Sequence, residues 1–315
     1  MEDRAQVSDK TARHFLAYAG IWCAVIAWGA SFVAARVLLH GEGTGPVSLS
    51  PTVLAALRFS IASLFFVVPF GVAIVRRQIS VRQLVQMAFL GQVAFSLYFW
   101  LQYTGVQKTN ASISSILVVG LIPVVTAFLS QFIGKERLSL IKFGALLLGF
   151  FGVAIIVLQQ QVQVTQAPDF LFGSLCLIGN AVAFAIYSNL SKRWMQDISP
   201  LVMTGGTMIS GTIGLLLLSL TDPINNRWAD VARLDTIQWV ALFFLASGCS
   251  VVAYFLYNSA LTRIEASLAT VYIYFEPVVA VLLGVTLLGE SLSWQTIFGT
   301  VAIGASVIIV NLIRK

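Results

Sequence analysis

Ten long apolar stretches, joined by short polar segments, constrain this 315-residue chain more than any other feature. Each holds close to the roughly 20 apolar residues that an α-helix needs to cross a bilayer, and is too long and continuous for a barrel strand. The stretches are residues 16–39, 51–75, 84–105, 111–133, 140–158, 170–190, 201–220, 237–261, 266–288 and 294–313. The sequence therefore predicts an all-α polytopic membrane protein with ten transmembrane helices.

The composition excludes most other classes of protein. Hydrophobic residues make up 58% of the chain and charged residues 10%, whereas a soluble domain has roughly 25% charged residues. Disordered, collagenous, disulfide-scaffold and nucleic-acid-binding chains have different compositions again. We therefore expect membrane lipid, and no nucleic acid, as a partner. The longest connection, about residues 221–236, leaves no room for a soluble domain.

The first stretch exceeds the roughly 7–15 apolar residues of a signal peptide, so we expect it to remain as the first span. Cys23, Cys176 and Cys249 stand singly in apolar spans, which indicates packing and not a disulfide or a metal site. The sequence contains no Gly-x-x-x-x-Gly-Lys-Ser/Thr phosphate-binding loop. We therefore expect no metal or other cofactor and no ATPase subunit.

The basic residues gather on one side of the predicted spans. Fourteen of the 19 fall in segments that share one side: Arg4, Lys10, Arg13, Arg76, Arg77, Arg82, Lys135, Arg137, Lys142, Lys192, Arg193, Arg263, Arg314 and Lys315. Lys108, Arg227 and Arg233 fall on the other side, and Arg36 and Arg58 lie within spans. Because cytoplasmic segments are enriched in Lys and Arg, both termini are predicted to be cytoplasmic in a plasma or inner membrane. The net charge of +6 thus indicates orientation, and we assign it no anionic ligand.

The two halves of the chain resemble each other at an offset of 154 residues. Ser96, Trp100 and Tyr103 then align with Ser250, Tyr254 and Tyr257, Pro123 with Pro277, and Glu136 with Glu290. The pattern indicates a cytoplasmic segment 1–15, a five-span unit 16–158 and a second unit 170–313. Because five is odd, the second unit enters the membrane from the opposite side. Such inverted repeats are a recurring basis of secondary transporters, whose halves rock around a shared site.

Short motifs in both halves carry a family resemblance. The motifs are Ala56-Leu57-Arg58-Phe59, Asn110-Ala111-Ser112 with Pro123 and Gly134-Lys135-Glu136-Arg137-Leu138, and Glu265-Ala266-Ser267 with Pro277 and Leu288-Gly289-Glu290-Ser291-Leu292. They resemble the EamA-type transporters of the drug/metabolite transporter (DMT) superfamily over nearly the whole chain. The resemblance implies transport of amino acids or other small metabolites, often export, without ATP. A closer similarity to the YddG-like aromatic amino acid exporters is a further hypothesis.

Glu276 is the one acidic residue deep inside a predicted span. It lies about ten residues into the ninth span, roughly 15 Å along the helix and close to the bilayer midplane. The following Pro277 has no backbone N–H and so frees a carbonyl nearby. Ionisable groups at this depth in a membrane usually have a functional role. We expect Glu276 either to couple protons or to bind a substrate ammonium. The structural alternative is a neutral or Arg-paired carboxyl that fixes helix packing.

Two arginines and two prolines in the spans also have competing interpretations. Arg58 could bind a substrate carboxylate with its planar guanidinium, but its resemblance to a family feature favours pairing with a helix end or snorkelling. Arg36 ends the first span and is expected to snorkel. Pro123 and Pro277 share one register of the repeat, which favours symmetric kinks along the pathway over the ordinary frequency of proline in membrane helices.

Polar and aromatic residues recur at helical spacing in several spans. The sets are Gln92, Ser96, Phe99 and Tyr103; Ser247, Ser250, Tyr254 and Tyr257; Asn180, Phe184 and Tyr187, opposite Ala24, Trp28 and Ser31; and Tyr272 with Glu276. A spacing of three or four residues places each set on one helix face. Together the sets predict a cavity that stacks planar substrates, whereas any single member could serve helix packing. The candidate pathway residues are Glu276, Tyr272, Pro277, Pro123, Ser96, Trp100, Tyr103, Tyr254, Tyr257, Asn180, Tyr187, Trp28 and Arg58.

Two further groups are expected to be structural. Glu136 and Glu290 follow spans that end on opposite sides of the membrane, and we expect them to make capping or loop hydrogen bonds. Gly206, Ser210 and Gly214, and Ala145 with Gly149, have the four-residue spacing of close helix contacts, either inside the molecule or at a dimer face.

We therefore expect a secondary transporter that moves a small-molecule substrate, above all aromatic or hydrophobic amino acids or related compounds, by alternating access and in the export direction. A drug or amine efflux carrier of the same fold and a channel-like facilitator are the alternatives. An intramembrane enzyme is disfavoured, because His14 and His40 lie at span edges and no pair of acidic residues falls within the spans. Proton coupling and uniport, and monomer and homodimer, all remain open.

Overall fold

The computed structural model describes residues 2–40, 48–108, 116–158, 170–221, 228–288 and 293–313. Within these ranges the chain is almost entirely helical and contains no strand. The same ranges contain ten helical runs that are long and apolar enough to cross a membrane, judged by length and composition. The prediction of an all-α, ten-span protein is confirmed.

Each span is one helix or a run of short helices. The elements of the first unit are α1 (Glu2–His40), α2 (Pro51–Val75), α3 (Val81–Gly91), η1 (Gln92–Leu97), α4 (Tyr98–Lys108), η2 (Ile116–Gly120), α6 (Leu121–Ile133) and α7 (Leu140–Leu158). Those of the second unit are α8 (Phe170–Trp194), η3 (Met195–Asp197), α9 (Pro200–Thr221), η4 (Trp228–Arg233), α10 (Thr236–Phe244), η5 (Leu245–Val252), α11 (Ala253–Leu261), α12 (Ala266–Val271), η6 (Tyr272–Phe275), α13 (Glu276–Leu288) and α14 (Trp294–Leu312).

Several helices begin where the sequence supplies a capping side chain. Ser80 accepts a hydrogen bond from the backbone of Gln83, whose own side chain accepts one from the backbone of Ser80. Asp235 and Gln238 make the same reciprocal pair at the start of α10. Such capping boxes satisfy backbone donors that the first helical turn leaves free. The short polar connections therefore fix where these spans start.

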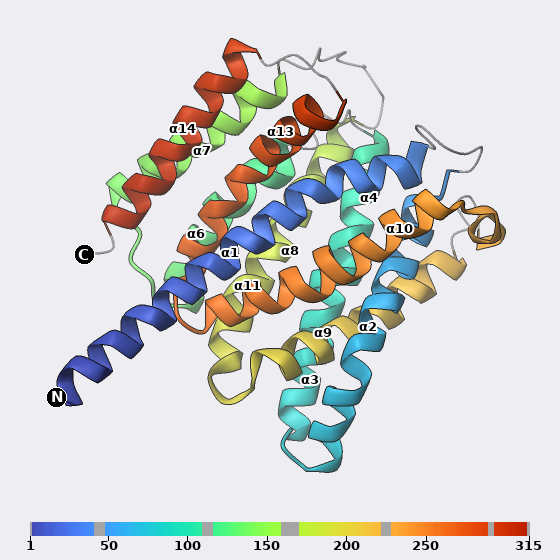
Figure 1. Cartoon of the computed structure of the whole chain (residues 1–315), viewed down its shortest axis with the longest axis horizontal. Coiled ribbons are helices and arrows are strands. Elements are labelled where there is room, and N and C mark those ends of the chain that lie inside the picture. The colour runs from blue at the N-terminus through green and yellow to red at the C-terminus, as the bar shows by residue number, and fades with distance from the viewer. Residues whose placement is uncertain are drawn as a thin grey trace.

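The helices of the two units interlock in pairs that repeat across the molecule (Figure 1). α1 packs on α11, and α8 packs in the same relation on α4, because the first span corresponds to the sixth and the third to the eighth. α2 packs on α9 and α7 on α14, which pairs the second span with the seventh and the fifth with the tenth. Figure 1 shows α7 and α14 along one edge, opposite α2, α3 and α9. This mutual pairing of corresponding spans agrees with an inverted repeat of two five-helix units.

Four spans change helix type part of the way along. The third and eighth contain the π-helical segments η1 and η5, which lie at one register of the repeat because they hold Ser96 and Ser250. The fourth starts, in its described part, with the π-helical η2, and the ninth contains the 3-10 segment η6. Pro123 and Pro277 follow η2 and η6 directly, in the first turn of α6 and α13. The helix runs on from η2 and η6 without a break, so each proline leaves a carbonyl of the preceding turn without its amide donor.

The small residues noted in the sequence serve contacts inside the molecule. A Cβ added to Gly214 would collide with Ser96 and Gln92, and one added to Gly149 would collide with the ring of Tyr274. A Cβ added to Gly206 would lie 2.5 Å from the sulfur of Met87. Glycine at these positions lets α9 and α7 approach their neighbours closely.

Candidate functional site

A cluster of aromatic rings fills the space between the two units. Its centre is Tyr254 on α11, which is 4% exposed. The Tyr254 ring centroid lies 5.2 Å from that of Trp28, 6.4 Å from Phe59, 5.1 Å from Phe95 and 6.2 Å from Tyr187. These rings come from the first, second, third, sixth and eighth spans, so both halves of the repeat contribute to this ring cluster.

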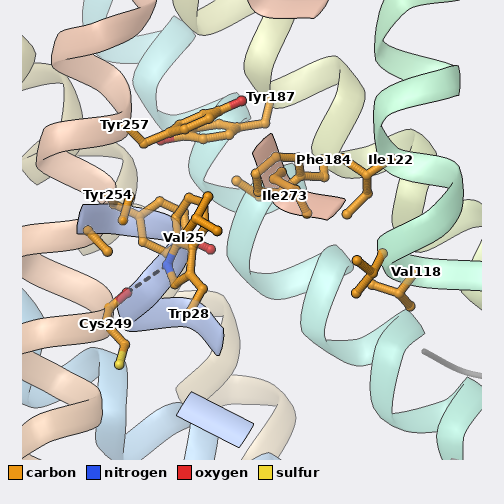
Figure 2. Packing of buried hydrophobic residues seen from close by; sticks show 14 of the residues in the cluster. Val25, Trp28, Val118, Ile122, Phe184, Tyr187, Cys249, Tyr254, Tyr257 and Ile273 are labelled. Carbon is orange, nitrogen blue, oxygen red and sulfur yellow. Dashed lines mark hydrogen bonds between the residues drawn. The ribbon is translucent and has the colours of Figure 1, made fainter. Parts of the chain in front are cut away.

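Phe184 on α8 extends the ring cluster toward the ninth span (Figure 2). Its centroid lies 6.2 Å from Trp28, 5.9 Å from Tyr98, 6.1 Å from Tyr187 and 5.8 Å from Tyr257. Most of these pairs are tilted or edge-to-face, the arrangements that aromatic quadrupoles favour. The rings therefore pack against one another as a buried aromatic core where the two units meet.

Trp28 is held in place by the irregular backbone of the eighth span. Its indole Nε1 donates a hydrogen bond of 2.9 Å to the carbonyl of Cys249 in η5 (Figure 2). The Cys249 thiol in turn donates to the carbonyl of Ala27, 3.1 Å away. A π-helical turn does not pair its carbonyls in the usual α-helical way. The π segment thus provides the acceptor that orients the indole.

Glu276 occupies the point where the ninth span changes from 3-10 to α-helix. The side chain is 9% exposed, and the described part of the chain provides neither a hydrogen bond nor an ion pair to its carboxyl. It lies near the hydroxyls of Tyr98 and Tyr254 in the ring cluster. The Arg-paired alternative is therefore not found among the described residues, and the carboxyl is left available beside the rings.

Arg58 approaches the same tyrosines from the second span. Its Nε donates a hydrogen bond of 2.7 Å to the Ser250 hydroxyl, and its guanidinium carbon lies 5.0 Å from the centroid of the Phe59 ring. Arg58, like Glu276, lies near the hydroxyls of Tyr98 and Tyr254. Arg58 thus points inward to the π segment η5, and neither a helix end nor snorkelling accounts for its position. For Arg36, the side chain lies outside the described residues.

Three predicted residues form hydrogen bonds beside the rings. Asn180 has no exposed surface, and its Nδ2 donates a hydrogen bond of 2.8 Å to the backbone carbonyl of Tyr98. The Oδ1 of Asn180 has no hydrogen-bond partner among the described residues. The Tyr257 hydroxyl donates to Ser188 at 2.8 Å, and the Tyr187 hydroxyl accepts from Asn258 at 2.7 Å. Buried polar groups without partners are costly, so the free Asn180 oxygen marks a place where a further donor would fit.

Tyr272 lies away from this group, contrary to the expected shared face with Glu276. Its ring centroid is 6.1 Å from Tyr18 and 5.4 Å from Trp22 on α1, and its hydroxyl pairs with Asn311 on α14. The cause is the 3-10 segment η6, because three residues per turn rotate the side chains away from the α-helical i, i+4 register.

Two predicted residues of the third span, Ser96 and Trp100, also lie outside the ring cluster. Ser96 donates to the carbonyl of Gly211 on α9 at 3.0 Å and to Gln92 at 2.9 Å, so it serves the contact between η1 and α9. Trp100 is 41% exposed and lies on the outer surface. Tyr103 keeps a link to the ring cluster through Phe99, whose ring centroid lies 5.7 Å from that of Tyr103 and 5.0 Å from that of Phe59.

Sequence reasoning missed Phe59, Phe95 and Tyr98 as members of the ring cluster. Phe59 adjoins Arg58 within the Ala-Leu-Arg-Phe motif, and this proximity was the available signal. Phe95 and Tyr98 flank the end of η1. Because a π turn holds more residues than an α turn, side chains after it are rotated relative to the 3.6-residue spacing.

The fold and this arrangement define a polytopic membrane protein built as an inverted repeat, with a buried carboxyl and an aromatic cluster between its halves. The model of the EamA-like transporter family matches residues 15–158 and again residues 171–312. The chain belongs to this family of transporters, which is part of the DMT superfamily.

Similar proteins are named as transporters. An uncharacterised transporter of Archaeoglobus fulgidus is 28% identical over 275 residues, which cover 87% of this chain and 90% of that protein. The uncharacterised transporter YoaV of Bacillus subtilis is 26% identical over 294 residues, 90% of this chain and 92% of its own. A solved crystal structure matches with a TM-score of 0.75 and 19% identity over 96% of each chain, which shows the shared fold.

Proposed function

We propose that the protein is a secondary transporter that exports amino acids or related small metabolites across a plasma or inner membrane by alternating access. The observation that carries the proposal is the Glu276 carboxyl, buried between the two units and without a partner among the described residues. An α-ammonium group would satisfy it, because buried charges need opposite charge or hydrogen bonds. The export direction rests on the family resemblance.

The ring cluster and Arg58 support an amino acid over a simple amine. The Arg58 guanidinium and the Glu276 carboxyl both lie near the Tyr98 and Tyr254 hydroxyls. An amino acid presents an ammonium and a carboxylate together, and arginine pairs well with carboxylates. Rings such as Trp28 and Tyr254 could then contact an aromatic or hydrophobic side chain.

Uptake into proteoliposomes loaded with unlabelled substrate tests the function. We expect saturable counterflow of at least one amino acid, and its loss in Glu276→Gln. Trp100→Phe serves as the control, because Trp100 lies on the outer surface and should leave flux unchanged. Absence of saturable flux for all amino acids and related metabolites would contradict the proposal, and flux that rises without saturation would favour a channel-like facilitator.

A cationic amine or drug is the second candidate, since the free Glu276 carboxyl alone would bind it. Arg58→Gln separates the two cases. It should abolish amino acid flux, which needs a partner for the carboxylate, and leave amine flux intact. If Glu276 couples protons instead of binding the ammonium, Glu276→Gln should keep substrate binding and counterflow, and should lose only the dependence of net flux on a pH gradient.

A further inference from the structure

A network of charged residues at one end of the bundle ties the two units together. Glu136 lies in the turn between α6 and α7. One of its oxygens accepts from Lys192 on α8 at 3.1 Å and from the Ala266 amide at 2.8 Å. The other accepts from the amide of Ser267 at 3.3 Å and from the Ser267 hydroxyl. Every donor belongs to the second unit, whereas Glu136 belongs to the first.

A second ion pair crosses the same boundary. Lys142, near the start of α7, donates to Glu265 at 3.0 Å and to the Ser267 hydroxyl at 2.7 Å. The Ser267 hydroxyl therefore joins both pairs, by donating to Glu136 and accepting from Lys142. We call Glu136, Lys142, Lys192, Glu265 and Ser267 the charged lock. It connects the ends of α6, α7, α8 and α12, all at one end of the molecule.

The turn that carries Glu136 is shaped for this contact. Lys135 adopts the left-handed backbone region with φ 55°, which costs free energy in a residue other than glycine. The chain then returns so that the Glu136 amide donates to the carbonyl of Ser130, 3.0 Å away. Burial raises the pKa of Glu136, but the Lys192 ammonium and the donors on Ser267 and Ala266 outweigh it and hold the pKa below its usual range. Glu136 is therefore ionised in the charged lock.

A file of buried polar side chains runs from the ring cluster to the charged lock. On α8, Phe184, Ser188 and Lys192 follow at four-residue spacing, so they share a face and span about 12 Å. Ser188 accepts from Tyr257 at 2.8 Å, and Asn258 donates to Thr204 on α9 at 2.9 Å.

On α6, Ser130 continues the same polar file. It donates to Asn189 at 2.8 Å, and Asn189 donates to the Thr126 carbonyl at 3.2 Å. The polar file thus comprises Thr126, Ser130, Ser188, Asn189, Thr204 and Asn258, all 0–1% exposed.

These groups are only partly satisfied in the state described. The Oδ1 of Asn258 and the Oγ1 of Thr126 have no hydrogen-bond partner among the described residues. Apolar packing would serve a permanently closed contact better, because buried polar atoms without partners are destabilising. Such side chains are favourable where water replaces the missing partners in another conformation of the molecule.

We infer that the polar file is the cytoplasmic half of the substrate pathway, held shut in this conformation by the charged lock. The inference rests on the proposed transport function and on the predicted orientation, which places the turn 134–139 in the cytoplasm. When the units rock apart at this end, the ion pairs of Glu136 and Lys142 separate, and water enters between α6 of the first unit and the polar file on α8, α9 and α11 of the second. A substrate then passes along the polar file between the cytoplasm and the ring cluster.

Thiol accessibility in the purified full-length protein tests this inference without any substrate. In a Cys23→Ala parent, Ser191→Cys on α8 and Thr126→Cys on α6 each place a reporter that is fully buried in the closed state. Reaction with a water-soluble maleimide is followed by mass spectrometry of the modified peptide. We expect slow labelling in the parent and an increase of at least about tenfold at both reporters with Glu136→Gln, because charged hydrogen bonds that hold the closed state are lost.

Arg137→Gln is the matched control, since Arg137 is the exposed neighbour of Glu136 and should leave both rates unchanged. Should Glu136→Gln fail to fold, Ser267→Ala removes the hydroxyl shared by the two ion pairs and should produce a smaller increase of the same sign. Unchanged labelling in a folded lock variant would overturn the inference. A rise at one reporter alone would also overturn it, because fraying of a single helix end would suffice. Neither result bears on transport itself, which the flux assay decides.

Discussion

Two buried carboxyl groups of this chain, on Glu136 and Glu276, differ in how many hydrogen-bond donors surround them. Glu136 accepts hydrogen bonds from Lys192, from the Ala266 amide and from both the amide and the hydroxyl of Ser267. Glu276 receives none from the described residues, although it is equally buried. A carboxylate with several donors holds structure together, whereas one without donors can accept a ligand or a proton. The capping role expected for Glu136 is confirmed by its contacts at the start of α12.

Glu136 should make stability depend on pH in a defined direction. We expect Glu136→Gln to lower the unfolding temperature in detergent by about 4 °C at pH 7, for a loss on the order of 2 kcal/mol. Folding lowers the pKa of Glu136 from its usual 4.5. The stabilisation is therefore complete above about pH 4.5 and is lost as the pH falls through the folded-state pKa.

Thermal melts of both proteins between pH 7 and pH 3 provide the measurement. The difference in unfolding temperature should shrink at the acid end. A difference that stays constant over this range would show that Glu136 stabilises the protein by packing and not by charge.

Helix irregularity recurs at matching places in the two units. η1 and η5 interrupt the third and eighth spans with π turns, and η2 and η6 precede the two prolines. In η5 the consequences are visible, since Cys249 accepts from Trp28 and Ser250 accepts from Arg58. Irregular backbone within a membrane is tolerated where protein groups use the freed carbonyls. Of these segments, η5 thus delivers a backbone acceptor, the Cys249 carbonyl, to the ring cluster.

Helix contact can be tested on α7 with two glycines. A Cβ at Gly152 would lie 2.8 Å from the Gly299 carbonyl oxygen on α14, whereas one at Gly144 would meet nothing within 4 Å. We expect Gly152→Ala to destabilise the protein by about 2 kcal/mol, because backbone must move. Gly144→Ala should be neutral or stabilising by up to about 1 kcal/mol, since alanine favours helix. Unfolding temperatures in detergent compare the two, and equal values would mean that α7 and α14 do not pack closely.

The sequence predicted whole spans better than the faces they present. Apolar length alone locates spans such as α2 and α7, because lipid demands it wherever a helix crosses. Which side chain faces inward depends on the local helical turn, and tertiary contacts set that turn. Hence Trp28 and Tyr254 could be anticipated near the molecular centre, whereas Phe95 could not, and Tyr272 was assigned to the wrong face beside Glu276.

At the scale of the whole molecule, no five-helix unit packs only with itself. α1 of the first unit lies against α11 and α13, and α8 of the second unit lies against α4 and α6. The same exchange brings α2 to α9 and α7 to α14. Each unit therefore completes the other's buried surface, and the ring cluster lies where the exchange occurs. Relative motion of the units would therefore change the surroundings of this cluster.

Orientation in the membrane is a prediction of the charge distribution. We expect green fluorescent protein fused to either terminus to fluoresce, and alkaline phosphatase fused there to be inactive, because both termini are predicted to be cytoplasmic. Alkaline phosphatase inserted in the segment 222–227, predicted to be outside, should be active. The reverse pattern would invert the assignment of the charged lock to the cytoplasmic end.

The contacts of Glu136 and Lys142 also bear on how the chain is assembled during synthesis. A ribosome that has produced residues up to 158 has already delivered both side chains, but Lys192, Glu265 and Ser267 are still to come. Until α8 and α12 are inserted, these two charges stay in water at the membrane surface. When the second half packs against the first, Glu136 and Lys142 are buried in contacts with Lys192, Glu265 and Ser267. Because of the order of translation, this end of the protein is therefore among the last parts to form its contacts.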